Sequence, residues 1–344
     1  MLLLHGFPEL AYSWRKVIIP LAEAGYHVLA PDQRGYGQTT GSDNQFNGDV
    51  ASFRLFNLVR DAMGVAFAFG HAQVQCVVGH DFGSSVAAWC AVIRPDMFKS
   101  VVLMSAPFAG TPSLPVAGSG KASAATQRKG VAAIDHSALA SLNPPRKHYQ
   151  WYYSTEPANE NMWHSPQGLR QFLRAYYHHK SADWADNQPR PLATWSAEVL
   201  AQLPTYYVMH QSAGMAETVA AEMPDTNSIG ANQWLPEPEL TVYVDEYTRT
   251  GFQGGLNWYR CVTSGAHIAE LQTFAGLTID NPSMFIAGAS DWGIYQKPGE
   301  YESMQSSACT AMTGCHLVNG AGHWVQQEKS EEVNRLLIEF LAAA

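Results

Sequence analysis

Short apolar runs alternate with longer amphipathic segments along most of the chain. The apolar runs predict buried strands, whereas in the longer segments apolar residues recur at helical spacing. Strands are expected at residues 2–4, 26–30, 74–78, 101–104, 283–288 and 316–318, and helices at 13–24, 51–69, 84–93 and 331–341. Strands that alternate with helices indicate a mostly parallel sheet covered by helices on both faces, so the predicted fold class is α/β.

The alternation is interrupted once, after the fourth predicted strand. Residues 108–145 are rich in Ala, Ser, Gly and Pro, which predicts a linker. Residues 146–260 have a helical pattern crowded with Trp, Tyr and Met, which predicts a helical lid inserted into the sheet domain. We therefore expect residues 1–107 and 261–344 to form the two parts of one core domain.

Charge and composition narrow the range of partners. The formal net charge of -9 argues against nucleic acid or an anionic membrane as a partner. No apolar stretch approaches the length needed to span a membrane. Five cysteines, an odd number, and the lack of a signal-peptide pattern favour a cytoplasmic protein with free thiols. Adjacent His178 and His179 cannot share a helix face, so we expect no metal there, and no cofactor is predicted.

A sharp turn is predicted between the strand at 74–78 and the helix that follows it. The turn reads Gly79-His80-Asp81-Phe82-Gly83, with small residues on both sides of an aspartate. This is the pattern of the nucleophile elbow of the α/β-hydrolases, with Asp81 where serine usually stands. Side chains at Gly79 and Gly83 are expected to clash with the neighbouring strand and helix. Alone, the pattern also fits an ordinary turn in which Asp81 caps the helix.

Two further residues strengthen the interpretation of Asp81 as a nucleophile. Asp291 follows the strand at 283–288, and His323 follows the strand at 316–318. Parallel strands bring their carboxyl ends to one edge of the sheet, so these side chains should meet Asp81. The chain order of nucleophile, acid and histidine is that of the α/β-hydrolases. The backbone N–H groups of Phe7 and Phe82 would complete the site as an oxyanion hole.

An aspartate nucleophile limits the reactions that the site can catalyse. Attack of a carboxylate on an ester or amide gives an anhydride, whereas attack on an sp3 carbon gives an ordinary alkyl ester. Water activated by His323 would then hydrolyse this ester, with Asp291 orienting the imidazole. The leaving group is either a halide or the oxygen of an epoxide. Phe82 offers no side-chain N–H to a halide, and an epoxide oxygen needs a weak acid such as a phenol.

Several motifs together resemble the soluble epoxide hydrolases of the α/β-hydrolase superfamily. They are His5-Gly6-Phe7-Pro8-Glu9, the elbow at 79–83, Gly322-His323-Trp324, Tyr149-Gln150 before Glu156-Pro157, and Asn257-Trp258-Tyr259-Arg260. The resemblance implies a catalytic triad of Asp81, Asp291 and His323, with Tyr149 and Tyr259 as the acids that open the epoxide ring. Tyr152 and Tyr153 are close rivals of Tyr149. It also implies that substrate contacts His5, Pro8, Trp151, Tyr152 and Trp324.

The resemblance implies hydrolysis of an epoxide to a vicinal diol, and the aromatic, Met-rich lid favours a bulky apolar substrate. We expect a monomer or homodimer. One departure is that strands normally precede the strand of the His-Gly-Phe-Pro loop in this family, whereas here that strand begins at Leu2. We therefore expect a narrower sheet with residues 26–30 at an edge. Two alternatives remain: a haloalkane or haloacid dehalogenase, which halide release would reveal, and a ligand-binding scaffold with a hydrolase fold, which would not turn over an epoxide.

Overall fold

Five parallel strands form the central sheet of the protein. The computed structural model describes residues 1–114 and 134–343. The strand order is β1-β2-β3-β6-β7, and every neighbouring pair is parallel. Their bounds are Leu2–Leu4 for β1, Val77–His80 for β2, Val101–Met104 for β3, Ser283–Gly288 for β6 and Met312–Val318 for β7. The predicted α/β class and the predicted parallel sheet are therefore confirmed.

One predicted strand is absent from the described sheet. Leu29 makes a single bridge to Leu2, with the Leu3 N–H donating to the Leu29 carbonyl at 2.8 Å. Residues 26–30 are thus not a strand, which corrects the prediction. Gly25 turns the chain with a positive φ just before this segment, and Pro31, which has no N–H, follows it. Only Leu29, near the end of the segment, pairs with β1, so the segment lies beside β1 without forming a strand.

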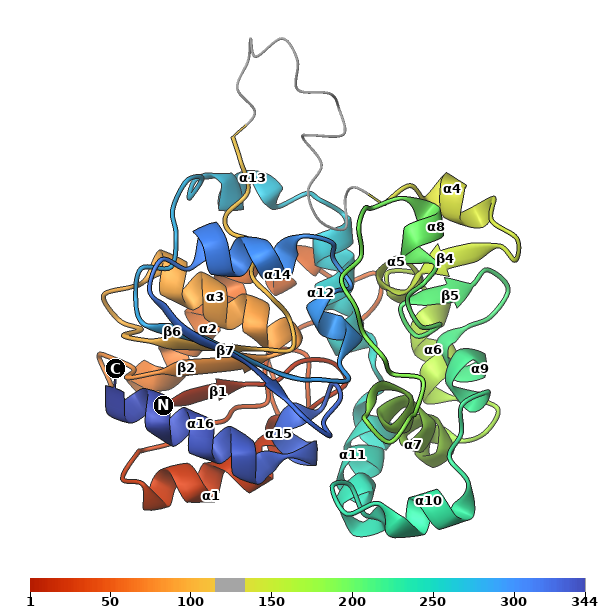
Figure 1. Ribbon diagram of the computed structural model, residues 1–344, viewed down its shortest axis with the longest axis horizontal. Coiled ribbons are helices and arrows are strands. Elements are labelled where there is room, and N and C mark those ends of the chain that lie inside the picture. Colours follow the sequence, from red (N-terminus) through yellow and green to blue (C-terminus); the bar gives the residue numbers. More distant parts are fainter. Residues whose placement is uncertain (115–133, 344) are drawn as a thin grey trace.

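Helices cover both faces of the sheet, and alternate strand residues face the two layers (Figure 1). Val77 and Val101 pack with α2 and α3, whereas Val78 and Val102 pack with α1 and α16. The strands are apolar on both sides because both faces are buried. The covering elements are α1 (Arg15–Glu23), preceded by η1 (Ala11–Trp14); α2 (Leu55–Ala68), preceded by η2 (Val50–Phe53); α3 (Phe82–Ile93); α14 (Glu300–Ser303); and α15 (Val325–Glu328) with α16 (Ser330–Ala343).

A mainly helical region is inserted between β3 and β6, and most of it stands beside the sheet layers (Figure 1). Its helices are α4 (His136–Ala140), α5 (Tyr149–Tyr153), α6 (Pro157–Trp163), α7 (Leu169–Lys180), α8 (Ala197–Leu200), α9 (Met215–Ala220), α10 (Thr226–Ala231), α11 (Glu237–Thr250), α12 (Gln253–Thr263) and α13 (Ile268–Gln272). It also contains an antiparallel pair, β4 (Arg146–His148) and β5 (Val208–His210), which the helical pattern did not predict. We refer to residues 136–263 as the lid.

The predicted linker at 108–145 lies partly outside the described residues, and its described part carries α4. The predicted domain boundaries at residues 107, 145 and 260 stay predictions. None of the helices in the described ranges has the combined length and apolar character needed to cross a membrane. All five cysteines are described, and all are free.

Candidate active site

Asp81 stands at the tip of a strained turn between β2 and α3. Its backbone has φ 53° and ψ −119°, a conformation that is rare for a residue with a side chain. The turn requires glycine on both sides: a Cβ at Gly79 would overlap the carbonyl of Gly83, and a Cβ at Gly83 would overlap the carbonyl of Leu4. The clash predicted at these two positions is confirmed. The strain therefore aims the Asp81 carboxyl out of the sheet.

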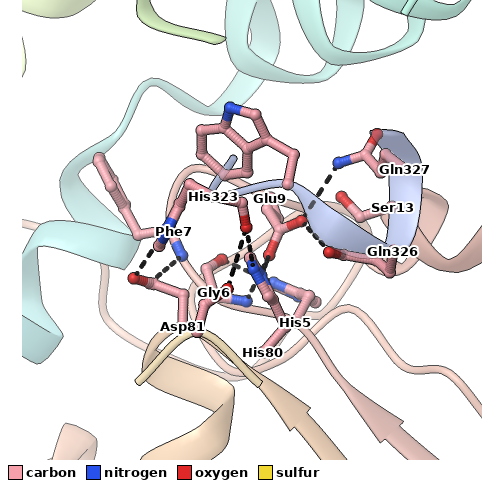
Figure 2. A network of polar contacts seen from close by, with 12 residues as sticks. His5, Gly6, Phe7, Glu9, Ser13, His80, Asp81, His323, Gln326 and Gln327 are labelled. Atoms are coloured by element: carbon pink, nitrogen blue, oxygen red, sulfur yellow. Dashed lines mark hydrogen bonds and ion pairs between the residues drawn. The ribbon is translucent and has the colours of Figure 1, made fainter. Parts of the chain in front are cut away.

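The two oxygens of Asp81 have different partners (Figure 2). Oδ1 accepts a hydrogen bond from the Phe7 N–H at 3.0 Å, and Oδ2 lies 3.3 Å from Nε2 of His323. Burial opposes ionisation of Asp81, but the adjacent His323, helped by the charge of Lys180, holds the pKa of Asp81 below its usual value. The carboxyl is thus ionised, with one oxygen held by the backbone.

The second predicted donor of the oxyanion hole is the Phe82 N–H. Phe82 is the first residue of α3, so its N–H has no partner within the helix. No hydrogen bond from this N–H to Asp81 occurs in the described structure. Phe7 is therefore seen in the predicted arrangement, whereas the role of Phe82 stays a prediction.

His323 is held between the two predicted aspartates. Its Nδ1 lies 3.1 and 3.2 Å from the two carboxyl oxygens of Asp291, and the Gly293 N–H donates to Asp291 at 2.6 Å. Both His323 and Asp291 are almost completely buried. Burial would raise the pKa of Asp291, but the charge and hydrogen bonds of His323 keep it below the usual value. An ionised Asp291 orients the Nδ1–H tautomer and leaves Nε2 facing Asp81.

A buried pair of Glu9 and His80 supports this site, and the sequence did not predict it (Figure 2). His80 Nδ1 lies 2.5 Å from Glu9 Oε2, and His80 Nε2 lies 2.7 Å from the backbone carbonyl of His323. Both partners are hydrogen-bond acceptors, so both ring nitrogens must carry hydrogen when Glu9 is ionised. His80 is then an imidazolium that holds the backbone of His323 in place.

The other oxygen of Glu9 is also occupied. Gln326 and Gln327 of α15 donate to Glu9 Oε1 at 2.7 and 3.3 Å, and the Gly6 N–H donates to Oε2 at 3.1 Å. Glu9 therefore joins the loop of Phe7 to the loop of His323. The only sequence signal was a charged residue directly after the His-Gly-Phe-Pro motif, and its partner His80 lies 71 positions away.

The lid brings both predicted tyrosines over the core. The ring of Tyr259 packs edge-on against Phe7 at 5.5 Å and Phe82 at 5.4 Å between centroids, and lies 6.0 Å from the ring of Tyr149. Burial and the charge of Asp81 raise the pKa of both phenols well above the usual value, so both stay protonated. The Tyr259 hydroxyl has no hydrogen bond to a described residue, whereas that of Tyr149 donates to Gln296 at 3.1 Å.

The rivals of Tyr149 have other partners. The Tyr153 hydroxyl donates to Tyr176 at 3.0 Å, and the Tyr152 hydroxyl donates to Asn161 at 2.7 Å. Trp151 is 44% exposed and stacks on the ring of His136. The placement of Trp151 therefore does not support the predicted substrate contact, and the hydroxyl of Tyr152 is engaged within the lid. The charge of Asp81 contributes to the raised pKa of Tyr149 but not to the raised pKa of Tyr152 or Tyr153, so Tyr149 is the better candidate for the first acid.

The remaining predicted contact residues mainly hold the loops of the site. His5 is buried, its Nδ1 facing the Gly6 carbonyl and its Nε2 accepting from the Gln33 N–H at 3.0 Å. The Pro8 carbonyl accepts from the Tyr177 hydroxyl at 2.9 Å. Trp324 places its ring 4.7 Å from that of His323 and donates its indole N–H to the Tyr177 carbonyl at 2.8 Å. Trp324 thus lies directly beside His323.

The arrangement suits nucleophilic attack by a carboxylate followed by hydrolysis. Asp81 Oδ2 is free to attack a carbon beneath the lid tyrosines, while Oδ1 stays on the Phe7 N–H. His323 can take a proton from water at Nε2, because Asp291 stabilises the imidazolium that forms. The described residues contain no cluster of three or more His, Cys, Asp or Glu side chains that could hold a metal ion.

Comparison with known proteins agrees with this geometry. Residues 1–330 match the α/β hydrolase fold family. Epoxide hydrolase B of Mycobacterium tuberculosis is 32% identical, with 99% of this chain and 90% of that protein covered. Epoxide hydrolase 2 of Siraitia grosvenorii is 27% identical over 99% of this chain and 91% of that protein.

Solved structures give the same result. An epoxide hydrolase from an endophytic Streptomyces superposes with a TM-score of 0.77 at 28% identity, covering 99% of this chain and 88% of that one. Potato (Solanum tuberosum) epoxide hydrolase I superposes with a TM-score of 0.70 at 26% identity, covering 100% and 92%. Sequence motifs, site geometry and full-length similarity agree, and the chain belongs to the epoxide hydrolases of the α/β-hydrolase fold family.

Proposed function

We propose that this protein hydrolyses an apolar epoxide to a vicinal diol through a covalent ester on Asp81. The observation that carries the proposal is the carboxylate at the elbow, with Oδ1 on the Phe7 N–H and Oδ2 3.3 Å from His323. Attack by Oδ2 opens the ring, and a lid phenol gives its proton to the epoxide oxygen as the C–O bond breaks. Tyr259 and Tyr149 are the proposed acids.

The second half of the reaction regenerates the carboxylate. His323 Nε2 takes a proton from water, and the water oxygen adds to the ester carbon of Asp81. The oxyanion forms at the oxygen that the Phe7 N–H already holds, with Phe82 as the proposed second donor. Breaking the ester bond then releases the diol, whose new hydroxyl contains the original oxygen of Asp81.

The two indole groups that lie beside Phe82 and His323 favour an epoxide over a halide. The ring of Trp258 lies 5.0 Å from that of Phe82, but its N–H donates to the Arg34 carbonyl at 2.9 Å. The Trp324 N–H is likewise used by the Tyr177 carbonyl. Neither is free to hold a halide, whereas the Tyr259 hydroxyl has no competing hydrogen bond in the described structure. The aromatic surroundings of Asp81 suit an apolar substrate.

Three further proposals concern the cellular compartment, the oligomeric state and the binding partners of the protein. Free cysteines support the proposal that it acts in the cytoplasm, where thiols stay reduced. We propose a monomer or homodimer that binds no nucleic acid, in keeping with the formal net charge of -9.

Trapping the ester tests the proposal directly. His323→Ala should still be alkylated but should not hydrolyse the ester, so its intact mass should rise by the mass of one epoxide. Asp81→Ala should gain no mass and make no diol, whereas Asp96→Ala, which removes an exposed carboxylate paired with Arg94, should keep full activity. In single turnover of the parent enzyme in H₂¹⁸O, the label should enter Asp81 rather than the diol. Label in the diol after one turnover, or no adduct on His323→Ala while substrate binds, would overturn the mechanism.

A further inference from the structure

The end of α7 is attached to the loop that carries His323. The His323 N–H donates to the Lys180 carbonyl at 2.9 Å. Glu328 is half-buried beside this contact and accepts from the N–H groups of Ala182 at 2.8 Å and of Gly322 and Trp324 at 2.9 Å. These bonds join the lid to both neighbours of His323. The position of Lys180 is therefore fixed relative to the triad.

The side chain of Lys180 is buried without an anionic partner in contact. The residue is 4% exposed, and its Nζ lies 5.1–5.7 Å from the centroids of four rings, those of Tyr176, Tyr206, Tyr207 and Trp324. No described residue accepts a hydrogen bond from Nζ or forms an ion pair with it. Aromatic faces attract a cation, but a buried ammonium without a carboxylate in contact is otherwise costly. If residue 180 only filled the space among these rings, an apolar side chain would do so without the cost of burying a charge.

The charges around Lys180 are those of the active site. Burial lowers the pKa of Lys180 below its usual value, and the negative charges of Asp81, Asp291 and Glu9 oppose this effect. Glu9 is balanced by His80, with which it is in contact at 2.5 Å. Asp81 and Asp291 thus leave two negative charges on either side of His323, and Asp81 has the largest effect of the three carboxylates on Lys180.

We propose that Lys180 is a positioning residue that acts through the carboxyl group of Asp81 by favouring negative charge on it during ester hydrolysis. The inference rests on the proposed covalent mechanism. In the alkyl-enzyme, Asp81 is a neutral ester. When water attacks, its proton moves to His323 and the carbonyl electron pair moves to the oxygen of Asp81 on the Phe7 N–H. Breaking the ester bond then restores the carboxylate and passes the proton from His323 to the departing diol oxygen.

The two half-reactions should respond differently to this charge. Alkylation removes negative charge from Asp81, so a nearby cation does not assist it. Hydrolysis returns negative charge to the same group, so the cation lowers its barrier. Loss of Lys180 should therefore slow hydrolysis and leave alkylation at least as fast.

Lys180→Met tests this, because methionine keeps an unbranched side chain among the four rings and removes the charge. We expect ester hydrolysis to slow on the order of ten-fold, less than the 10²–10³ lost with a direct oxyanion donor. Rapid quenching with intact-mass detection should then show more alkyl-enzyme at steady state, with kcat lowered. Lys180→Arg restores the charge and should recover most of the hydrolysis rate. Lys147→Met is the matched control, because it removes a lysine that lies over the ring of Tyr152 in the lid.

Equal hydrolysis rates for the parent and Lys180→Met would overturn the proposal, as would equal slowing of both half-reactions that arginine does not rescue. If Lys180→Met does not fold, the same comparison is made with Lys180→Gln against Lys180→Arg. Failure of the underlying mechanism is distinguishable, because the parent and His323→Ala would then form no adduct. If the parent forms the adduct and Lys180→Met hydrolyses it at the same rate as the parent, only the proposed role of Lys180 is contradicted, and the covalent mechanism stands.

Discussion

The two sides of the active site are built in different ways. On the core side, Asp81, His323 and Asp291 follow strand ends, and each is fixed by polar contacts to a neighbour or to the backbone. On the lid side, Tyr259 is placed by ring packing against Phe7 and Phe82, and its hydroxyl has no hydrogen bond to a described residue. The core side therefore holds its charged groups in a fixed geometry. The lid side positions Tyr259 by the packing of its ring and leaves the hydroxyl available to the substrate.

This difference follows from the chemistry required of each side. An ionised nucleophile and an imidazole must stay aligned through two steps, so their surroundings must not rearrange. A proton donor must instead exchange its hydrogen bond with a substrate, and a hydroxyl already bound within the protein would have to break that bond first. By this criterion Tyr259 is better placed to donate a proton than Tyr149, whose hydroxyl is hydrogen-bonded to Gln296 and Gln150.

The largest effect on stability is expected on the core side, from Glu9→Gln. The substitution breaks a buried ion pair and should lower the free energy of unfolding by about 3–5 kcal/mol. The amide that replaces the carboxylate can accept through one oxygen only, so either the Gly6 N–H at Oε2 or the two glutamine donors at Oε1 would lose their acceptor. Urea unfolding at pH 5.5 measures the loss. Glu339→Gln, which removes an exposed carboxylate beside Arg335, should leave stability close to that of the parent.

The stability lost in Glu9→Gln should depend on pH in a defined direction. Burial alone would raise the pKa of Glu9 and lower that of His80, but their mutual attraction reverses both shifts. The depressed pKa of Glu9 contributes stability above about pH 4.3, which is lost as the pH falls through its folded pKa. The raised pKa of His80 contributes stability below about pH 6.5, which is lost as the pH rises through its folded pKa. The difference should therefore be greatest between these values and smaller at pH 9; a loss that grows with pH would contradict the ion pair.

On the lid side, Tyr259→Phe should affect catalysis rather than stability. Loss of the proton donor should slow alkylation by roughly ten-fold or more, the low end of general acid catalysis. The melting temperature should hardly change, because the hydroxyl has no hydrogen bond to a described residue. Single-turnover kinetics measures the rate of alkylation. The double variant with Tyr149→Phe should be nearly inactive, since one phenol partly substitutes for the other.

Tyr152→Phe is the matched control for the lid acids, because its hydroxyl donates to Asn161 and not to the site. It should leave alkylation within about two-fold of the parent. If Tyr152→Phe slows alkylation and Tyr149→Phe does not, the first acid is Tyr152. If neither Tyr149→Phe nor Tyr259→Phe slows it, the lid tyrosines are not the proton donors.

The sequence predicted the core side well because its geometry is local. The elbow at Asp81 depends on glycines within two residues of it, and the triad depends on which residue follows each strand. The pairing of Glu9 with His80 could not be predicted, since it joins loops 71 positions apart without a shared pattern. Lys180 gave no signal either, because its surroundings come from α7, the segment around Tyr206 and the loop after β7.

The sequence was less informative about features that depend on neighbours elsewhere in the fold. The strand expected at 26–30 makes only one bridge, because pairing also depends on the residues beside it. Trp151 was expected to contact substrate, although helical periodicity places Tyr149 and Tyr153 on one face of α5 and Trp151 on the other. The motif identified the helix correctly but did not assign its faces.

The smallest effect should come from Trp151→Ala on the outer face of α5. The indole is 44% exposed and stacks on His136, with ring centroids 4.3 Å apart and planes 5° from parallel. We expect KM and kcat for aryl and aliphatic epoxides to stay within about two-fold of the parent, with a stability loss of about 1 kcal/mol from the lost stacking. Steady-state kinetics and thermal unfolding measure both. A several-fold rise in KM confined to bulky aryl epoxides would show that the indole reaches the substrate, and the outer face of α5 would then belong to the active site after all.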